Sequence, residues 1–392
     1  MTDRARQADR PKIFAYYFPD YHADARNAAW FGEGWDEWHL VRAAVPRFPE
    51  HLQPKVPLLG HQDEADPAVA QSSIELADRF GIDGFIFDYY WYDDGPYLQR
   101  ALDEGFLGAP NPERVEFSLM WANHDLLDIF PRRDLTTMPR TLKRGAIGRA
   151  AFERMARHVV DRYFWRPHYT RVHGRPRFSI YEVGALIRGL GGVREAADAL
   201  NWFDGLARES GHPGVHFDAV VWGFAVLPAE IPIAAPEKLI RELGFRSASS
   251  YVWIHHADSA QHPFPFADTW REVAAAAFLE YDGYRKRLGV PFHPNATAGW
   301  DASARVAAEA EFSRDDLPYT PVWQATPADF EHGLRLAKSF ISASGYDYRE
   351  LTINAWNEWT EGSYLLPDEV DGFARLEAVL RVFGPRANRG SS

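Results

Sequence analysis

Short apolar runs bounded by turn-forming residues recur eight times along the chain, and the stretches between them have helical periodicity. The runs predict strands at residues 13–19, 82–91, 115–123, 177–183, 217–224, 249–255, 293–301 and 351–359. Helices are predicted near residues 67–80, 96–106, 150–164, 193–209, 236–243, 266–288, 327–344 and 368–383. Eight strands alternating with eight helices are typical of a (β/α)8 TIM barrel, which is therefore the predicted fold within the α/β class.

A single domain is expected, because no linker rich in Pro and Ser divides the chain. Residues 85–87 and 219–221 are apolar without alternation, as in parallel strands that are covered on both faces. We expect the barrel to cover residues 11–385 and the two ends, residues 1–10 and 386–392, to be disordered tails.

The segment between the first predicted strand and the first predicted helix, residues 20–66, is much longer than an ordinary βα loop. It is rich in Trp and carries Trp30, Trp35, Glu37 and Trp38. It leaves its strand at the carboxyl end, which is the face of a barrel where active sites are built. The sequence therefore predicts that this first βα loop contributes to a functional site.

Aromatic residues make up 15% of the chain and include 14 Trp. Buried Trp needs a partner for its indole N–H, so many Trp residues suggest platforms that keep one face in contact with solvent or ligand. Sugars present flat arrays of C–H groups that suit such platforms. The alternative, that most of these residues fill the core, stays open at this point.

The formal net charge of −12 disfavours nucleic acid and anionic membranes as partners. The chain has no Cys, which excludes disulfides and thiol nucleophiles. Residues 1–10 are polar, and no stretch approaches the ~20 apolar residues of a membrane span. We expect a cytoplasmic protein without a membrane span, and its oligomeric state is left open.

Acids, amides and aromatic residues stand at the ends of the predicted strands, where they would form one rim of the barrel. We expect this rim to bind a carbohydrate or glycoconjugate substrate. The predicted substrate-binding residues are Tyr16, Tyr17, Trp35, Glu37, Trp38, Asp88, Tyr89, Trp91, Trp121, Asn123, Tyr181, Tyr251, Trp253, Asn357 and Tyr364. In particular, Trp35, Trp38, Trp91 and Trp121 are expected to line one concave site.

Glu358 and Glu361 are the candidate catalytic pair. Glycoside cleavage needs one carboxyl group to protonate the leaving oxygen and a second carboxylate to stabilise or attack the reacting carbon. Residues three apart on a strand point to opposite sides, so the chain must turn after Trp359 for the two side chains to converge. Thr360 and Gly362 make such a turn feasible. Whether one glutamate is a direct nucleophile is left open, as is a surface role for Glu361.

Residues 354–364, Asn-Ala-Trp-Asn-Glu-Trp-Thr-Glu-Gly-Ser-Tyr, resemble the signature of WbsX-like proteins. This family is often labelled as glycosyltransferases and is related to glycoside hydrolase family 99, the endo-α-mannosidases. Further matching segments are residues 30–38, 51–54, 81–85, 90–91, 121–123, 174–176 and 180–181. The chain departs from the family pattern at residues 124–128, Val183 and Leu366, which leaves the sugar and its linkage open.

The resemblance implies a retaining hydrolase that acts on an α-glycoside of the α-mannoside class and uses no cofactor. By this resemblance, Glu358 deprotonates the 2-hydroxyl of the sugar, which closes onto C1 as a 1,2-anhydro sugar. Glu361 protonates the leaving group and then activates water.

Three other classes of function are considered. A glycosyltransferase or transglycosylase in polysaccharide or glycoconjugate biosynthesis follows the family label, but the chain has no Asp-X-Asp. A metal-dependent hydrolase would need clustered ligands, whereas His255 and His256 are adjacent and would face opposite ways on a strand. A carbohydrate-binding barrel without activity would not need the two glutamates. We expect no metal site.

Overall fold

The computed structural model describes residues 10–133, 137–225, 229–257, 270–312 and 322–386, which contain a sheet of parallel strands at their centre. The strands are β1 (Lys12–Tyr17), β2 (Gly84–Tyr92), β4 (Glu116–Trp121), β8 (Arg175–Ile180), β9 (His216–Val220), β10 (Ser247–Ser249), β11 (Phe292–His293), β12 (Asn295–Thr297) and β13 (Glu350–Asn354). Their order in the sheet is β11-β10-β9-β8-β4-β2-β1-β13-β12. Every neighbouring pair is parallel.

Pro294 alone separates β11 from β12, so the two ends of this order belong to one interrupted strand and the sheet closes on itself. Proline has no N–H to donate to a neighbouring strand, which explains the interruption. Its carbonyl still accepts a hydrogen bond from the Thr352 N–H at 3.1 Å. With β11 and β12 counted as one position, the sheet has eight strand positions, and the predicted TIM barrel is confirmed.

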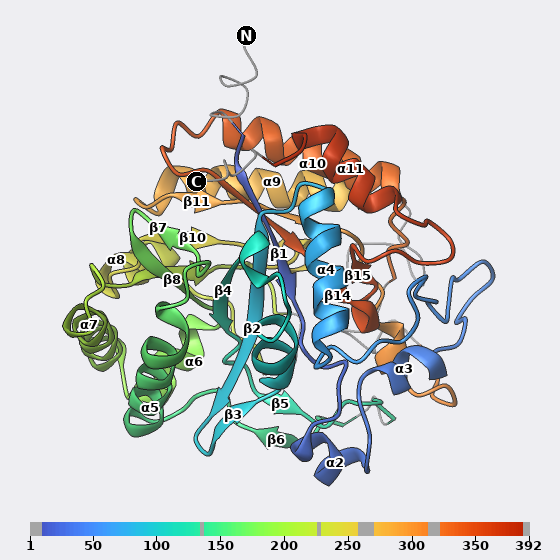
Figure 1. The fold of residues 1–392 in the computed structure, drawn as a ribbon, viewed down its shortest axis with the longest axis horizontal. Helices are drawn as coiled ribbons and strands as arrows, with labels where there is room; N and C mark the ends of the chain where they lie inside the picture. Colours follow the sequence, from blue (N-terminus) through green and yellow to red (C-terminus); the bar gives the residue numbers. More distant parts are fainter. Residues whose placement is uncertain (1–9, 134–136, 226–228, 258–269, 313–321, 387–392) are drawn as a thin grey trace.

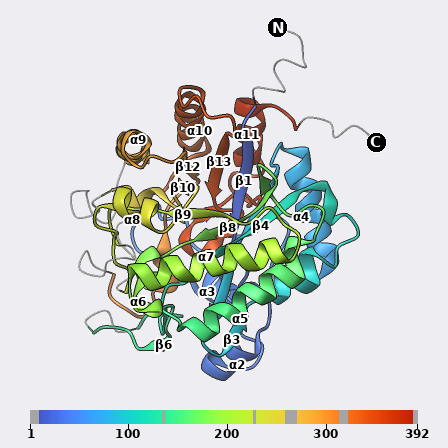
Figure 2. The same cartoon turned by 90° about the vertical axis from the view of Figure 1, so that its left-hand side faces the viewer.

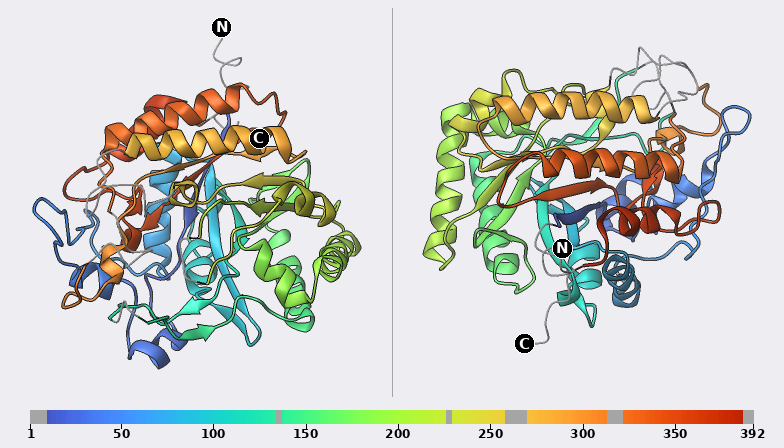
Figure 3. Two further views of the ribbon diagram at one scale, coloured as in Figure 1. Left: turned by 180° about the vertical axis from the view of Figure 1, so that it is seen from behind. Right: turned by 90° about the horizontal axis from the view of Figure 1, so that it is seen from above.

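Helices surround the barrel (Figures 1 and 2). They are α4 (Pro67–Arg79), η1 (Ala101–Phe106), α5 (Arg149–Val159) with its continuation η3 (Val160–Phe164), α6 (Val183–Leu190), α7 (Val193–Glu209), α8 (Pro236–Glu242), α9 (Trp270–Arg287), α10 (Pro327–Ser342) and α11 (Ala374–Phe383). Helices α9, α10 and α11 lie beside one another on one side of the barrel (Figure 3). Among the described helices, none has the length and apolar character needed to span a bilayer.

Local sequence explains where these elements begin. Proline occupies the first helical position of α4, α8 and α10, where its missing N–H costs no hydrogen bond. Helix α10 also has a capping box, in which Thr326 and Asp329 each bind the other's backbone N–H. All nine residues of β2 are buried, as expected for a parallel strand between core and helices.

Two predicted elements differ in type from the structure. The run 249–255 is a strand only at its first residue, and residues Trp253–His256 form a 3-10 helix, η4. The run 96–106 starts as a short strand, β3 (Gly95–Tyr97), that pairs with β2, and becomes helical only at Ala101. An apolar run marks a buried segment, but its periodicity alone cannot separate a short strand from a short helix or a turn.

The first βα loop folds over the carboxyl end of the barrel and contains two short helices, α2 (Ala25–Phe31) and α3 (Trp38–Ala43). A two-stranded sheet made of β5 (Leu126–Leu127) and β6 (Thr141–Lys143) lies on the same side. In Figure 1, β3, β5, β6 and α2 lie in the lower part of the view, where β2 ends, and β3 pairs with the last residues of β2. These segments surround the carboxyl end of the barrel.

The opposite, amino-terminal end of the barrel is held by ion pairs. Arg177 lies between Asp218 at 3.3 Å and Glu350 at 2.5 Å, and all three side chains are buried. Arg10 and Arg386, which the sequence analysis assigned to disordered tails, both bind Asp83, at 2.6 and 3.4 Å. The expectation for those two residues was therefore wrong, and the other tail residues lie outside the described part of the chain.

Candidate active site

A pocket with an empty volume of about 760 Å3 opens at the carboxyl end of the barrel. Its charged and polar lining residues are Asp20, Asp88, Tyr90, Tyr97, His124, Asp125, Tyr181, Glu230, Tyr251, His255, Arg305, Glu358 and Glu361. Its apolar lining includes Phe18, Leu98, Met120, Phe130 and Trp300.

Glu358 and Glu361 enter this pocket from one tight turn. Glu358 ends the short strand β14 (Asn357–Glu358), which pairs with β15 (Ser363–Tyr364), and a 3-10 turn, η8 (Trp359–Glu361), connects them. Gly362 closes the turn at φ 63°. A Cβ atom at this glycine would lie 2.7 Å from the Cβ of Asp301, so both the conformation and the space require glycine. The turn expected after Trp359 is present.

Arg305 lies between the two glutamates. Its guanidinium forms an ion pair with Glu361, and it lies 3.8 Å from Glu358 and 3.4 Å from Glu37 of the first βα loop. The guanidinium also lies over the rings of Phe18 and Phe130, at 5.8 and 5.5 Å from their centroids. A single cation is thus shared among three buried carboxyl groups.

Tyr251 connects Glu358 with a further carboxyl group, that of Asp88. Its hydroxyl oxygen lies 3.0 Å from Asp88 Oδ2 and 3.0 Å from Glu358 Oε2. A phenol has one proton to donate, so both contacts are hydrogen bonds only when one of the two carboxyl groups carries a proton and donates it to Tyr251. When that proton is present, the three side chains form one hydrogen-bonded unit beside the pocket.

The surroundings of both carboxyl groups favour their protonated forms. Burial raises the pKa of Glu358 well above its usual range, the negative charge of Glu361 raises it further, and Arg305 opposes both effects. Burial likewise raises the pKa of Asp88, against the hydrogen bond from Tyr251. Burial therefore favours the protonated form of both carboxyl groups.

A second polar group lines another part of the pocket wall. The Tyr181 hydroxyl donates to Glu230 at 2.5 Å, and His255 Nε2 lies 3.3 Å from that hydroxyl and 3.7 Å from Glu230. Trp222 stacks on the His255 ring at 4.9 Å. The rings of Tyr181 and Tyr251 are in edge contact at 5.3 Å, so this group continues directly from the one around Glu358.

A family model matches the sequence of this chain over almost the whole barrel. The family described as Glycosyltransferase WbsX matches residues 13–379. The chain belongs to the WbsX family. The resemblance noted in residues 354–364 is thereby confirmed.

Two curated relatives of this WbsX family member come from strains of Xanthomonas campestris pv. campestris, and both are described as uncharacterized protein WxcX. The relative from strain B100 is 27% identical over 371 residues, and the other is 28% identical over 378 residues. Each match covers 94% of this chain and 49% of the relative. The chain thus spans about half the length of the curated relatives it matches.

Solved structures with the same fold include the GH99 endo-alpha-mannosidase from Bacteroides thetaiotaomicron, with a TM-score of 0.57 and 14% identity. The match covers 95% of this chain and 96% of that one. A glycoside hydrolase-like protein gives a TM-score of 0.59 at 12% identity, with 95% and 94% covered. The barrel of this WbsX family member therefore shares its fold with these two structures.

Five of the residues that the sequence analysis selected line the pocket: Asp88, Tyr181, Tyr251, Glu358 and Glu361. The remaining twelve do not. Tyr16 packs against Tyr251 inside the barrel. The other eleven fall into three groups, according to whether the strand turns them outward, the first βα loop packs them elsewhere, or their polar atoms hold loop segments in place.

The outward group follows from alternation along the strands. In β2, Asp88 and Tyr90 line the pocket, whereas the ring of Tyr89 lies 6.0 Å from Tyr163 and that of Trp91 lies 5.2 Å from His158, both in the surrounding helices.

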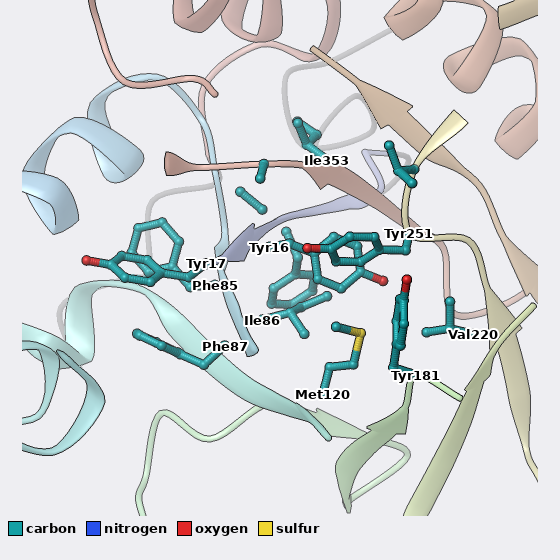
Figure 4. Close-up of a cluster of buried hydrophobic side chains, with 14 of the residues drawn as sticks. Tyr16, Tyr17, Phe85, Ile86, Phe87, Met120, Tyr181, Val220, Tyr251 and Ile353 are labelled. Atoms are coloured by element: carbon teal, nitrogen blue, oxygen red, sulfur yellow. The ribbon is translucent and has the colours of Figure 1, made fainter. Parts of the chain in front are cut away.

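The same alternation applies in β4 and β1. Met120 lines the pocket, and Trp121 packs on Phe152 of α5. The ring of Tyr16 lies 4.6 Å from Tyr251, while Tyr17 stacks on Phe87 on the other side of the strands (Figure 4). The expectation that Trp91 and Trp121 line the site was wrong by one residue along each strand.

The aromatic residues of the first βα loop also lie outside the pocket. Trp35 packs on Phe31 at 4.5 Å and faces a neighbouring groove. Trp38 packs on Tyr21 at 4.3 Å, and its indole N–H donates to the Gln62 carbonyl at 2.9 Å. These two residues build the loop, so the prediction that they line the site was wrong. Glu37 reaches the site indirectly, through its contacts with Arg305 and Thr360.

The third group uses its polar atoms to hold the backbone. Asn123 exchanges two hydrogen bonds of 2.7 Å with the backbone of Glu182, and Asn357 exchanges two with that of Phe18. Trp253 donates its indole N–H to the Asn295 carbonyl at 2.9 Å.

Tyr364 belongs to the same group, although its partner is a side chain. Its hydroxyl donates to Asp368 at 2.6 Å. All four side chains fix the loops that carry the pocket residues and are absent from the pocket lining.

Arg305, Glu230, Tyr90 and Tyr97 are pocket residues that the sequence analysis did not select. Tyr90 could have been found, because it is two residues from Asp88 on the same strand and therefore shares its face. Arg305 carries no comparable signal, since it ends a short 3-10 helix, η6 (Ala302–Arg305), outside any predicted element. Within the described residues, no three His, Asp or Glu side chains are grouped so as to hold a metal ion.

Proposed function

We propose that this WbsX family member is a glycoside hydrolase that cleaves an α-glycoside of the α-mannoside class with retention of configuration. The observation that carries the proposal is the entry of Glu358 and Glu361 into one pocket from a single turn, with Arg305 between them. A pair of carboxyl groups that faces one concave site is the usual catalytic apparatus for glycoside cleavage. The shared fold with a family 99 enzyme supports the same assignment.

In the first step of the proposed reaction, Glu358 takes the proton of the sugar 2-hydroxyl. The oxygen of that hydroxyl forms a bond to C1 while the bond from C1 to the leaving oxygen breaks. Glu361 gives its proton to the leaving oxygen. The products are a 1,2-anhydro sugar, the released alcohol, a protonated Glu358 and an ionised Glu361.

In the second step, Glu361 takes a proton from water, and the water oxygen attacks C1. The bond from C1 to the 2-oxygen breaks, and that oxygen regains its proton from Glu358. Two successive inversions at C1 give overall retention, and both glutamates return to their initial states. The raised pKa of Glu358 suits this role, because a more basic carboxylate is better able to take a hydroxyl proton.

The experiment is a panel of aryl α-glycosides, containing the mannoside, glucoside, galactoside and rhamnoside, followed by NMR to identify the first anomer released. We expect turnover of the mannoside with release of the α-anomer. Absence of turnover across the whole panel, or release of the β-anomer, contradicts the proposal. Brisk cleavage of a 2-O-methyl α-mannoside contradicts the anhydro-sugar step alone and favours a carboxylate nucleophile.

Transfer of the sugar to another sugar is the second candidate, and the description of the family as a glycosyltransferase favours it. A 1,2-anhydro sugar can be opened by an acceptor hydroxyl as well as by water. Adding methyl α-mannoside to the assay distinguishes the two outcomes, because a transferase forms a disaccharide in preference to free sugar.

A further inference from the structure

Arg305 is the one lysine or arginine among the described residues that line the pocket. Its side chain is 6% exposed, and a guanidinium keeps its charge in such surroundings. Its positive charge faces the carboxyl groups of Glu358, Glu361 and Glu37. It also acts on the carboxyl group of Asp20 at a longer range. The charge balance of the whole site therefore depends on this one residue.

The backbone of Arg305 is fixed from one side by the segment before β6. The Arg132 N–H donates to the Arg305 carbonyl at 2.6 Å, and the Ala307 N–H donates back to the Arg132 carbonyl at 2.9 Å. These two reciprocal hydrogen bonds hold the two backbone segments side by side. Phe130, two residues earlier, provides one of the rings under the guanidinium.

The first βα loop fixes the start of the same segment. Asp301 caps η6 by accepting from the Ser303 N–H at 3.2 Å. Its carboxylate is held in turn by His51 at 3.0 Å and Gln53 at 2.8 Å, both from the first βα loop. The Asp301 N–H donates to the carbonyl of Glu361 at 2.6 Å, so the cap is tied directly to the turn that carries the glutamates.

Arg47, also in the first βα loop, binds the segment after Arg305. Its guanidinium donates to the carbonyl oxygens of Val306 at 2.6 Å, Ala307 at 2.9 Å and Ala310 at 3.1 Å. Three carbonyl groups bound by one guanidinium leave this segment little freedom to move. The loop thus holds the chain on both sides of Arg305, and Glu37 binds its side chain.

We propose that Arg305 is a positioning residue that sets the charge and orientation of the Glu358–Glu361 pair, and that the first βα loop acts on the site by fixing Arg305. This proposal rests on the roles proposed above for the two glutamates. It explains why a long loop covers the carboxyl end of the barrel while its Trp35 and Trp38 stay outside the pocket.

The electrostatic surroundings of Glu358 give the direction of the effect. Asp88 and Tyr90 face it from β2, Tyr251 from the loop after β10, and Glu361 from its own turn. The neighbouring carboxylates raise the pKa of Glu358 beyond the effect of burial, and Arg305 lowers it. Loss of the Arg305 charge should therefore raise that pKa by about 1 to 3 units, which is the usual effect of an opposite charge at this range.

The test compares Arg305→Met with Arg305→Lys and with Arg47→Met, which leaves every pocket charge in place. Glu carboxyl carbons are labelled with 13C, and the Glu358 signal is assigned by its absence in Glu358→Gln. We expect its titration midpoint to rise by at least one pH unit in Arg305→Met, to return most of the way in Arg305→Lys, and to rise by less in Arg47→Met.

An unchanged Glu358 midpoint in folded Arg305→Met overturns the proposal, whatever the activity. An unchanged midpoint in Arg47→Met overturns the part assigned to the first βα loop. If wild type cleaves no α-glycoside in the panel while these midpoints move as expected, the proposed function fails and the positioning role of Arg305 stands.

If a substrate is found, the acidic limb of the pH profile of kcat/KM should move to higher pH in the variants. The variants should follow the same order as their Glu358 titration midpoints. A purely structural role would lower kcat/KM at every pH and leave the limb where it is.

Discussion

Tyr251 has one hydroxyl proton and two carboxyl neighbours, each at 3.0 Å. When Glu358 is ionised to act as a base, Asp88 is the partner that can hold the extra proton, because burial raises its pKa as well. At the scale of single residues, Asp88 and Tyr251 therefore decide how readily Glu358 gains or loses a proton.

Tyr251→Phe should raise the pKa of Glu358, since the hydrogen bond from Tyr251 lowers it in the wild type. A base acts only when ionised, so the acidic limb of kcat/KM should move to higher pH. Loss of one hydrogen bond to a charged group predicts a fall in kcat/KM of about 10- to 100-fold. A pH profile of the variant measures both effects, and a limb that stays in place would contradict the connection to Glu358.

The two glutamates should respond differently to the leaving group. Glu361→Gln should lower kcat for a poor leaving group by about 10²- to 10⁴-fold and spare the first step with an activated aryl or fluoride leaving group. Glu358→Gln should be inactive with both, because no leaving group replaces the base. Pre-steady-state kinetics with the two substrate types tests this. Rescue of Glu358→Gln alone would reverse the two roles.

At the scale of elements, alternation along β2 and β4 accounts for the main error of the sequence analysis. The sequence showed that aromatic and acidic residues end these strands, but each strand is buried on both faces, so its pattern does not reveal which side faces the barrel interior. Asp88 settles the question for β2, because a carboxyl group there must reach the polar pocket. Without such a marker, Trp121 could not be placed.

The hydroxyl groups of Tyr90 and Tyr89 provide a matched pair to test this alternation. Tyr90→Phe removes a hydroxyl from the pocket lining, and we expect kcat/KM to fall by several-fold to about 10-fold. Tyr89→Phe changes the adjacent residue, whose ring packs on the surrounding helices, and should leave kcat/KM unchanged. Steady-state kinetics on both variants is the measurement. Equal effects would mean that alternation does not decide which residue meets the substrate.

At the scale of the whole molecule, the alternation of eight apolar runs and helical stretches was enough to predict the barrel, because each unit is local in sequence. The pocket was less predictable, because residues such as Arg305 and Glu230 come from loops whose positions depend on distant contacts. Arg305 is held by Arg47, His51 and Gln53 through Asp301 and carbonyl groups, about 250 residues away along the chain. No local pattern encodes contacts of that kind.

The ion pairs of Arg177 hold three strands of the barrel together at the end opposite the pocket. Arg177→Met should lower the free energy of unfolding by about 3 to 5 kcal/mol, because it leaves Asp218 and Glu350 buried without their cation. Urea unfolding measures this loss. The midpoint of the Glu358 carboxyl titration should be the same in folded Arg177→Met as in the wild type. A shifted titration midpoint would show that the two ends of the barrel are coupled.

Arg10 and Arg386 both bind Asp83, which directly precedes β2, so the first and last described residues of the chain meet at the amino-terminal end of the barrel. The pocket opens at the other end. A tag, a fluorescent protein or a surface linker attached directly at Arg10 or Arg386 would therefore be joined to the barrel at the end opposite the pocket. The proximity of Arg10 and Arg386 also favours circular permutation, in which a short peptide joins these two residues and new termini are opened in a helix-to-strand loop.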